Sequence, residues 1–223
     1  MKILVLPDIH GEIERLVRIL AGVDVKKIDL IISQGDFTDM YNVPEGFSQI
    51  DTAELIVQKL VSTKRKVLCV PGNHDPYEIV SLFEEYNINL HAKVREIGNI
   101  CFIGFGGAQT PFHTRFEPSE EEITETLEGL VKNIKKEFVL VVHAPPYNTK
   151  LDTVKGKHVG SKAIRIFIEK AKPRLVLTAH IHENHGVERI GTTKVFYPGP
   201  VFENRYGIVN IKDDKIECKE CTI

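Results

Sequence analysis

Side chains that can bind divalent metal ions gather at five points of this chain, each time directly after a run of apolar residues. The five groups are Asp8-Ile9-His10, Gly35-Asp36, Gly72-Asn73-His74-Asp75, His143 and Ala179-His180-Ile181-His182. Carboxylates, imidazoles and an amide oxygen suit zinc, manganese, iron or nickel, whereas a structural zinc site would use thiolates. A single histidine after an apolar run is usually an ordinary hydrogen-bonded residue. Five such groups in one pattern predict a metal site with open coordination positions, as catalysis requires.

In two of the groups the candidate ligands are two residues apart. Asp8 and His10 form one pair, and His180 and His182 form the other. Side chains alternate between the two faces of a β-strand, so we expect both members of a pair to point the same way. Each pair can then share one site.

The apolar runs before these groups predict buried β-strands, because they are short and rich in β-branched residues. The five strands before the groups are expected at residues 3–6, 30–33, 67–70, 138–142 and 175–178. A further strand is expected at residues 100–105. Apolar residues recur with helical spacing in 13–20, 123–134 and 163–171, and Ser119 with Glu122 fits a capping box before the second helix. Ligands of α/β proteins bind beyond the carboxyl ends of the strands, so the five groups should meet there.

The last part of the chain has a different pattern, of short strands separated by turn residues. These strands are expected at residues 187–190, 194–197, 207–211 and 215–218, and they predict an antiparallel arrangement. Alternating strands and helices followed by this region predict an α/β sandwich with helices outside and a core between mixed sheets. The length of 223 residues allows one large domain or two small ones. No linker-like segment interrupts the chain, so we expect a single domain over residues 1–223.

Composition and charge disfavour several classes of protein. The chain has 29 Lys and Arg against 31 Asp and Glu, which leaves a formal charge of −2 and no overall basic field for nucleic acid. The apolar N-terminal stretch is too short for a signal sequence or a membrane span, so we expect a cytoplasmic protein without a membrane partner. Strand edges near the C-terminus are compatible with pairing between subunits in a homo-oligomer.

The four cysteines do not resemble a disulfide framework. Cys69 and Cys101 lie in predicted strands, where free cysteine is a common small apolar residue. Cys218 and Cys221 form a C-x-x-C with two interpretations. It is half of a zinc or redox site, although no second pair occurs at zinc-finger spacing, or it is part of the last strand.

In their order along the chain, the motifs D-x-H, G-D, G-N-H-D, H and H-x-H resemble those of the calcineurin-like metallophosphoesterase superfamily. The resemblance covers nearly the whole chain and is to the small enzymes related to class III cyclic-nucleotide phosphodiesterases. It implies a four-layer α/β/β/α sandwich of two mixed β-sheets flanked by helices. The family usually has glycine at the position of Ala179, and we expect the alanine only to crowd the backbone near His180.

The resemblance also implies a role for each candidate residue in a centre of two divalent ions. One ion would be bound by Asp8, His10 and His182. The other would be bound by Asn73, His143 and His180. Asp36 would bridge both ions. His74 would contact the phosphate and protonate the leaving oxygen, and Asp39 would orient such a histidine.

This chemistry predicts a phosphodiesterase or phosphomonoesterase that acts on a small phosphorylated or nucleotide substrate. The expected nucleophile is a hydroxide shared by the two ions. A nuclease of the same superfamily is an alternative that the near-neutral charge disfavours. A non-catalytic scaffold with the same fold is another, disfavoured by the complete ligand set and by His74. Further candidates for the pocket rim are polar residues of the long loops and a nearby helix: His113, Arg115, Tyr147, Asn148, Lys157, His158 and Arg165.

Overall fold

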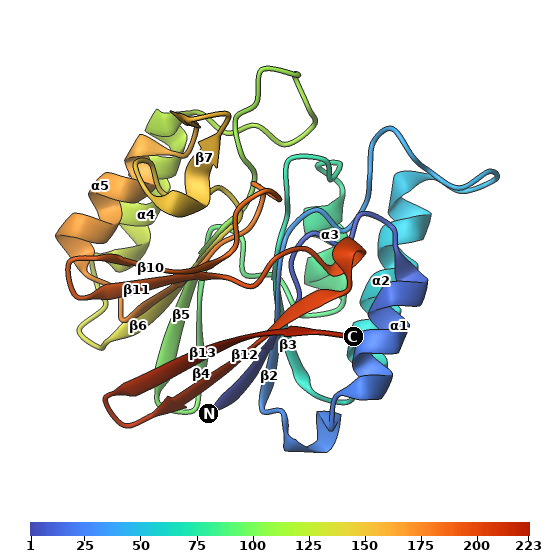
Figure 1. Ribbon diagram of the computed structural model, residues 1–223, viewed down its shortest axis with the longest axis horizontal. Coiled ribbons are helices and arrows are strands. Elements are labelled where there is room, and N and C mark those ends of the chain that lie inside the picture. The colour runs from blue at the N-terminus through green and yellow to red at the C-terminus, as the bar shows by residue number, and fades with distance from the viewer.

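The apolar runs form strands that are buried on both faces. In β1 (Lys2–Val5), Ile3 and Val5 belong to one hydrophobic core, while Leu4 and the following Leu6 belong to another. A strand that is apolar on both sides has to be covered on both sides. The computed structural model describes residues 1–223 and meets this requirement with four layers (Figure 1).

The two inner layers are mixed β-sheets. The first sheet has the order β13-β12-β1-β2-β3, in which β1, β2 and β3 are parallel. Its other strands are β2 (Leu30–Gln34), β3 (Lys66–Val70), β12 (Arg205–Lys212) and β13 (Lys215–Thr222). The second sheet has the order β10-β11-β9-β6-β5-β4, in which β11, β9, β6 and β5 are parallel. Its strands are β4 (Lys93–Ile97), β5 (Ile100–Phe105), β6 (Phe138–Val142), β9 (Leu175–Leu177), β10 (Gly186–Ile190) and β11 (Thr193–Tyr197).

Helices form the two outer layers. The first sheet is covered by α1 (Ile13–Gly22), α2 (Gln49–Ser62) and α3 (Ile79–Glu85). The second is covered by α4 (Glu120–Val131) and α5 (Lys162–Ala171), at the left of Figure 1. One core lies between the two sheets and one lies beneath each helical layer. The predicted α/β/β/α sandwich of two mixed sheets is therefore confirmed.

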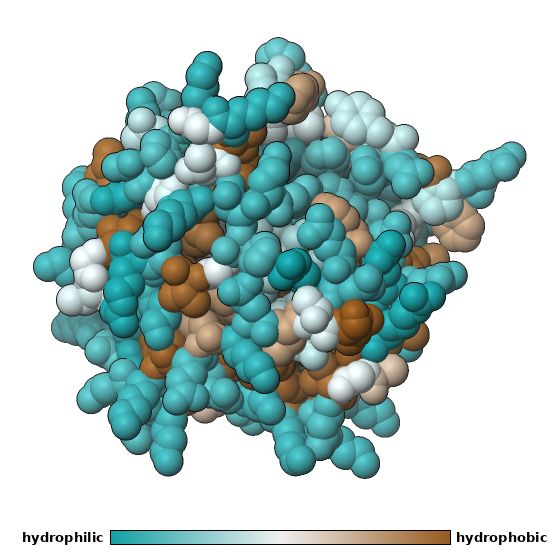
Figure 2. Space-filling view, in the orientation of Figure 1, coloured by the Kyte–Doolittle hydropathy of each residue, from teal (hydrophilic) through white to brown (hydrophobic).

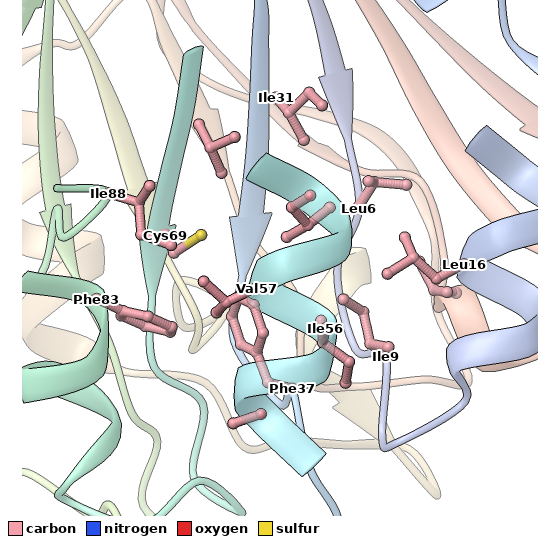
Figure 3. Packing of buried hydrophobic residues seen from close by; sticks show 14 of the residues in the cluster. Leu6, Ile9, Leu16, Ile31, Phe37, Ile56, Val57, Cys69, Phe83 and Ile88 are labelled. Atoms are coloured by element: carbon pink, nitrogen blue, oxygen red, sulfur yellow. The ribbon is translucent and has the colours of Figure 1, made fainter. Parts of the chain in front are cut away.

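The core beneath α1, α2 and α3 extends to the ends of the strands. Figure 3 shows Ile9 and Phe37, which follow β1 and β2, among the same apolar side chains as Ile56 and Val57 of α2. The Phe37 ring lies 4.9 Å from the ring of Phe83 on α3. On the face shown in Figure 2, apolar residues occur singly or in small groups among hydrophilic ones. In the interior, by contrast, the apolar packing around Ile9 and Phe37 continues up to the segments that carry the candidate ligands.

Several details differ from the sequence-based predictions. Each of the last two hairpins is antiparallel, but they lie in different sheets, and β11 pairs with β9 in parallel. The Ser119 hydroxyl caps α4 by accepting from the Glu122 amide at 3.1 Å, without the return bond of a capping box. The prediction passed over α2, α3 and β4. The chain has no helix of the length and apolar character that a membrane span requires.

Other short elements lie in the connections. Three 3-10 turns are η1 (Val25–Lys27), η2 (Lys150–Asp152) and η3 (Val201–Glu203), and a small hairpin consists of β7 (Thr153–Val154) and β8 (Lys157–His158). Cys218 and Cys221 both lie in β13 and are free thiols. Their separation by three residues places them on opposite faces of the strand. Two thiolates arranged in this way do not bind one ion, so the strand interpretation of the C-x-x-C holds.

Candidate metal centre

All five predicted groups meet at one edge of the sandwich. Asp8, Asp36 and Asn73 follow the parallel strands β1, β2 and β3, and His143 and His180 follow β6 and β9 of the other sheet. The centre therefore lies where the carboxyl ends of strands from both sheets come together.

The backbone at these positions corrects one argument from the sequence. β1 ends at Val5 and β9 at Leu177, so the pairs Asp8 with His10 and His180 with His182 lie beyond the strands. Strand alternation therefore does not orient them. Asp8 and His10 instead have φ angles of 51° and 49°, and His180 has 79°. These left-handed conformations, uncommon for residues other than glycine, turn the ligands toward the centre.

A buried apolar residue anchors each of these tight segments. Ile9 lies between Asp8 and His10 and is fully buried, and Ile181 lies between His180 and His182 with 7% exposure. Phe37 directly follows Asp36 and is also fully buried. Ile9 and Phe37 enter the core beneath α1, α2 and α3, and Ile181 is buried, while their polar neighbours face the centre. Packing thus determines where the polar groups point.

Two glycines allow the loops after β2 and β3 to approach each other. A Cβ atom on Gly72 would lie 2.1 Å from the backbone nitrogen and from Oδ1 of Asp36. A Cβ atom on Gly35, which has a φ of 97°, would lie 2.6 Å from Nδ1 of His143. No side chain fits at either position, so glycine is required for the centre to close.

Asp36 connects two clusters of candidate ligands. Its Oδ2 lies 3.4 Å from Nε2 of His10 and 3.3 Å from Nε2 of His143, while its Oδ1 accepts the backbone amide of His74 at 2.9 Å. Ligand atoms of Asp8, His10, Asp36 and His182 lie within 4.8 Å of one another, as do those of Asp36, His143 and His180. One carboxylate thus belongs to both clusters.

The charges in these clusters strongly perturb each other. Burial opposes the charged form of Asp36, but the imidazoles of His143 and His10 outweigh it and hold its pKa well below the usual value. Burial likewise opposes the charged form of His143, but Asp36 and Asp8 raise its pKa to about 9. Burial lowers the pKa of His180 to about 3. The carboxylates therefore attract positive charge to the centre, while His180 keeps a neutral imidazole.

The tautomer of His143 follows from its contacts. Its Nδ1 lies 2.6 Å from the backbone carbonyl of Gln34, which can only accept, so Nδ1 carries a proton. Its Nε2 lies 3.0 Å from Oδ1 of Asn73 and 3.3 Å from Oδ2 of Asp36. In the neutral imidazole, Nε2 and the two oxygens direct lone pairs at one another. This position therefore favours a positive charge, either a metal ion or the proton that the raised pKa of His143 places on Nε2 in the metal-free protein.

The donor set fits divalent metal ions. Nε2 of His10 and Nε2 of His182 are buried and have no hydrogen-bond partner. Buried polar atoms are rarely left unpaired in proteins, and imidazole nitrogens among carboxylates are ordinary ligands of zinc, manganese, iron and nickel.

His74 and Asp39 lie beside the centre on its more exposed side. Nδ1 of His74 is 3.5 Å from Oδ1 of Asp39, and Nδ1 of His10 is 4.0 Å from Oδ2 of Asp39. The rings of His74 and His10 meet edge to face at 5.0 Å. The side chains of His74 and Asp39 are 20% and 26% exposed, against 1% for Asp36. A molecule from solvent can therefore reach these two residues, as it can His182, whose side chain is 31% exposed.

The contacts around the centre include Tyr197, which the sequence analysis missed, and Asp75, which it named in the third group without a role. The Tyr197 hydroxyl donates to Oδ2 of Asp8 at 2.6 Å, and both residues are fully buried. The Asp75 carboxylate accepts from the amides of Gly72, Phe37 and Thr38 and so joins the loops after β2 and β3. Tyr197 is the last residue of β11, and its position at the carboxyl end of a strand could have identified it.

The predicted rim residues of loop 144–160 mostly stabilise that loop. Nη1 of Arg165 donates to the carbonyls of Tyr147 and Asn148, and Nδ1 of His158 lies 2.7 Å from the buried carboxylate of Asp152. These contacts account for the side chains of Arg165 and His158 without a ligand.

Comparison with known proteins agrees with this arrangement. The family model described as calcineurin-like phosphoesterase matches residues 1–184, which contain every candidate ligand. The chain belongs to the calcineurin-like phosphoesterase family. Membership indicates a phosphoester hydrolase of a family whose members use two metal ions.

Relatives of this chain match nearly its whole length. An uncharacterized protein of Methanocaldococcus jannaschii, MJ1162, is 38% identical over 225 residues, which is 96% of each chain. The crystal structure of TT1561 of Thermus thermophilus has a TM-score of 0.76 at 20% identity, over 98% of this chain and 97% of that one. A dimetal phosphatase from Danio rerio has a TM-score of 0.69 at 10% identity, over 99% and 95%. At these identities, the two structures support the fold alone.

The structure accommodates Ala179, which departs from the family pattern. Ala179 is fully buried in the core beneath α4 and α5, and its amide donates to the carbonyl of His143 at 3.0 Å. The left-handed residue is His180, one position later. Ala179 can therefore carry a methyl group while His180 stays beside Asp36 and His143.

Proposed function

We propose that this phosphoesterase is a single-domain cytoplasmic enzyme that hydrolyses a monoester or diester of phosphate at a centre of two divalent ions. Asp8, His10 and His182 would hold one ion, and Asn73, His143 and His180 the other. Asp36 would bridge them. The observation that carries the proposal is that Asp36 belongs to both ligand clusters.

Metal ions bound there would activate water and offset the negative charge of the phosphoryl group. Manganese, zinc, iron and nickel all suit the ligands. The buried carboxylate of Asp8, held by the Tyr197 hydroxyl, limits the net positive charge, so that product phosphate can leave. The fold and the family support hydrolysis, and the near-neutral charge of the chain favours a small phosphorylated or nucleotide substrate over a nucleic acid.

His74 is the proposed proton donor to the leaving oxygen. Its backbone amide is held by Oδ1 of Asp36, and its carbonyl accepts from Nε2 of Gln49 at 2.8 Å, so the residue is fixed at both ends. Its Nδ1 faces Asp39, which leaves Nε2 to carry the proton toward the substrate. The donating form is the imidazolium, in which both ring nitrogens carry a proton, and Asp39 would stabilise it by accepting from Nδ1.

The test compares two esters that differ only in the basicity of the leaving group. With manganese present, His74→Ala should lower kcat for a phenyl ester by about 10²- to 10⁴-fold. It should lower kcat for the p-nitrophenyl ester much less, because nitrophenolate leaves without a proton. His185→Ala, which removes a histidine that is paired with Glu220 and has no proposed role in the centre, is the matched control. An equal loss for both esters would remove His74 from this role, and no turnover of either ester by the unmodified protein would contradict the proposed function.

A further inference from the structure

Loop 106–118 lies against the candidate metal centre through Asn73. The Oγ1 atom of Thr114 is 3.1 Å from Nδ2 of Asn73 and 2.5 Å from Oε1 of Glu117. On its other side, Oδ1 of Asn73 lies 3.0 Å from Nε2 of His143. Glu117, Thr114, Asn73 and His143 thus form a continuous chain of polar contacts.

The direction of the hydrogen bonds along this chain is determined by Glu117. Burial opposes the charged form of Glu117, but hydrogen bonds from Thr110 and Thr114 outweigh it and lower its pKa, so it is a carboxylate near neutral pH. A carboxylate only accepts, and at 2.5 Å Glu117 takes the single hydroxyl proton of Thr114 in preference to the Thr110 hydroxyl, which is 3.4 Å away and itself donates to Glu117. The Thr114 oxygen can then only accept from Asn73. The NH₂ group of Asn73 must face Thr114, and its oxygen must face His143 and Asp36.

We propose that Thr114 is a positioning residue that fixes the side-chain amide of Asn73 with its oxygen toward the candidate metal centre. The proposal rests on the two-metal centre of the proposed function. The two orientations of an amide are nearly identical in shape, but only the oxygen has a lone pair to give to a metal ion. A reversed amide would direct an NH₂ group at the cation. One hydroxyl in a loop thereby decides whether Asn73 is a ligand.

The backbone of the loop is held independently of this hydroxyl. The amides of Arg115 and Phe116 both donate to the backbone carbonyl of Asn73, at 2.9 and 3.0 Å. The Phe116 side chain is 5% exposed and its ring meets that of His91 at 5.1 Å. Replacing the hydroxyl by a methyl group therefore leaves the loop anchored on Asn73 and removes only the constraint on the amide.

The experiment is a calorimetric titration of the metal-free full-length protein with Mn²⁺. The unmodified protein should bind two ions. Thr114→Val should keep one ion at its original affinity and bind the second about 10- to 100-fold more weakly, as substitutions behind a metal ligand do. Thr114→Ser keeps the hydroxyl and should restore the second affinity. Thr110→Val removes a different hydroxyl from the same carboxylate and should leave both affinities unchanged.

Each outcome decides a different point. Two ions bound equally well by Thr114→Val and by the unmodified protein would overturn the positioning role and leave the metal centre intact. No ion bound by the unmodified protein would overturn both. A loss in Thr110→Val as large as in Thr114→Val would show that Glu117 alone matters and would also overturn the role. If Thr114→Val does not fold, Thr114→Ala should show the same selective loss of one ion, and a variant with both ions would refute the proposal.

Discussion

At the scale of single residues, the centre depends on backbone conformations that are unfavourable by themselves. Asp8, His10, Asp36 and His180 all have φ angles between 49° and 79°. Each costs roughly 1–3 kcal/mol and persists only where the surroundings determine it. The burial of Ile9, Phe37 and Ile181 fixes these conformations, the first two by packing in the core beneath α1, α2 and α3. Packing thus arranges the candidate ligands.

His91 shows how a histidine outside the centre behaves in this protein. Its Nδ1 accepts the amide of Gly106 at 2.9 Å, and its ring packs against Phe105 and Phe116. Burial lowers its pKa from 6.5 to about 4. The folded protein therefore binds fewer protons here than the unfolded chain does between these two pH values. Acidification should destabilise the fold through this residue.

Because of His91, the free energy of unfolding should fall by about 1.4 kcal/mol for each pH unit below 6.5. Denaturant unfolding of the metal-free protein at several pH values between 7 and 4.5 measures the slope. In His91→Asn, which keeps an acceptor but cannot take up a proton in this range, the slope should be smaller by that amount. The other titrating groups are common to both proteins. Equal slopes would show that His91 does not carry this dependence.

At the scale of elements, the centre requires the loops after β2 and β3 to touch. Gly72 provides the contact, because its missing Cβ leaves room for the backbone and carboxylate of Asp36. Asp75 then bonds to both loops and holds them together. The two parallel strands are adjacent, and their loops act as one unit.

Gly72→Ala should therefore weaken metal binding and lower the midpoint of thermal unfolding, because Asp36 has to move. Gly129→Ala is the matched control, since nothing lies within 4 Å of its Cβ position on an exposed part of α4. The control should raise the free energy of unfolding by up to about 1 kcal/mol, as alanine favours helix over glycine. A Gly72→Ala protein with unchanged metal affinity and stability would contradict the close contact between the loops.

Elements with a strong local pattern could be predicted from sequence. The strands at 100–105 and 138–142 match β5 and β6, and the helices around 13–20 and 163–171 match α1 and α5. The hairpins at the end of the chain could be predicted singly, but their placement in two sheets depends on pairing with β9 and β1, far away in sequence. Local patterns carry no information on such partners.

The candidate site, too, could be predicted from the sequence only in part. Placement after apolar runs brought the ligand residues to notice, and the structure brings them together. How Asp8 and His10 turn inward could not be predicted, because it results from left-handed backbone and not from strand alternation. Tyr197 escaped notice because it contacts Asp8, which is far away in the sequence. Thr114 escaped notice because it contacts Asn73, which lies on another loop.

At the scale of the whole molecule, both halves of the sandwich contribute to one centre. The first sheet supplies Asp8, Asp36 and Asn73, and the second supplies His143 and His180. The core between the sheets holds these halves together. A ligand that binds only this assembled form stabilises the entire fold, by about 2.7 kcal/mol at a concentration of 100 times Kd.

The most direct test of the central claim is the number of metal ions bound per chain, measured by elemental analysis after loading with Mn²⁺ or Zn²⁺ and removal of the excess. We expect two ions for the unmodified protein and fewer for Asp36→Asn, because the bridging charge is lost. Asp24→Asn removes an exposed carboxylate paired with Lys27 and should retain both ions. No bound ion in the unmodified protein, or two in Asp36→Asn, would contradict a centre built around Asp36.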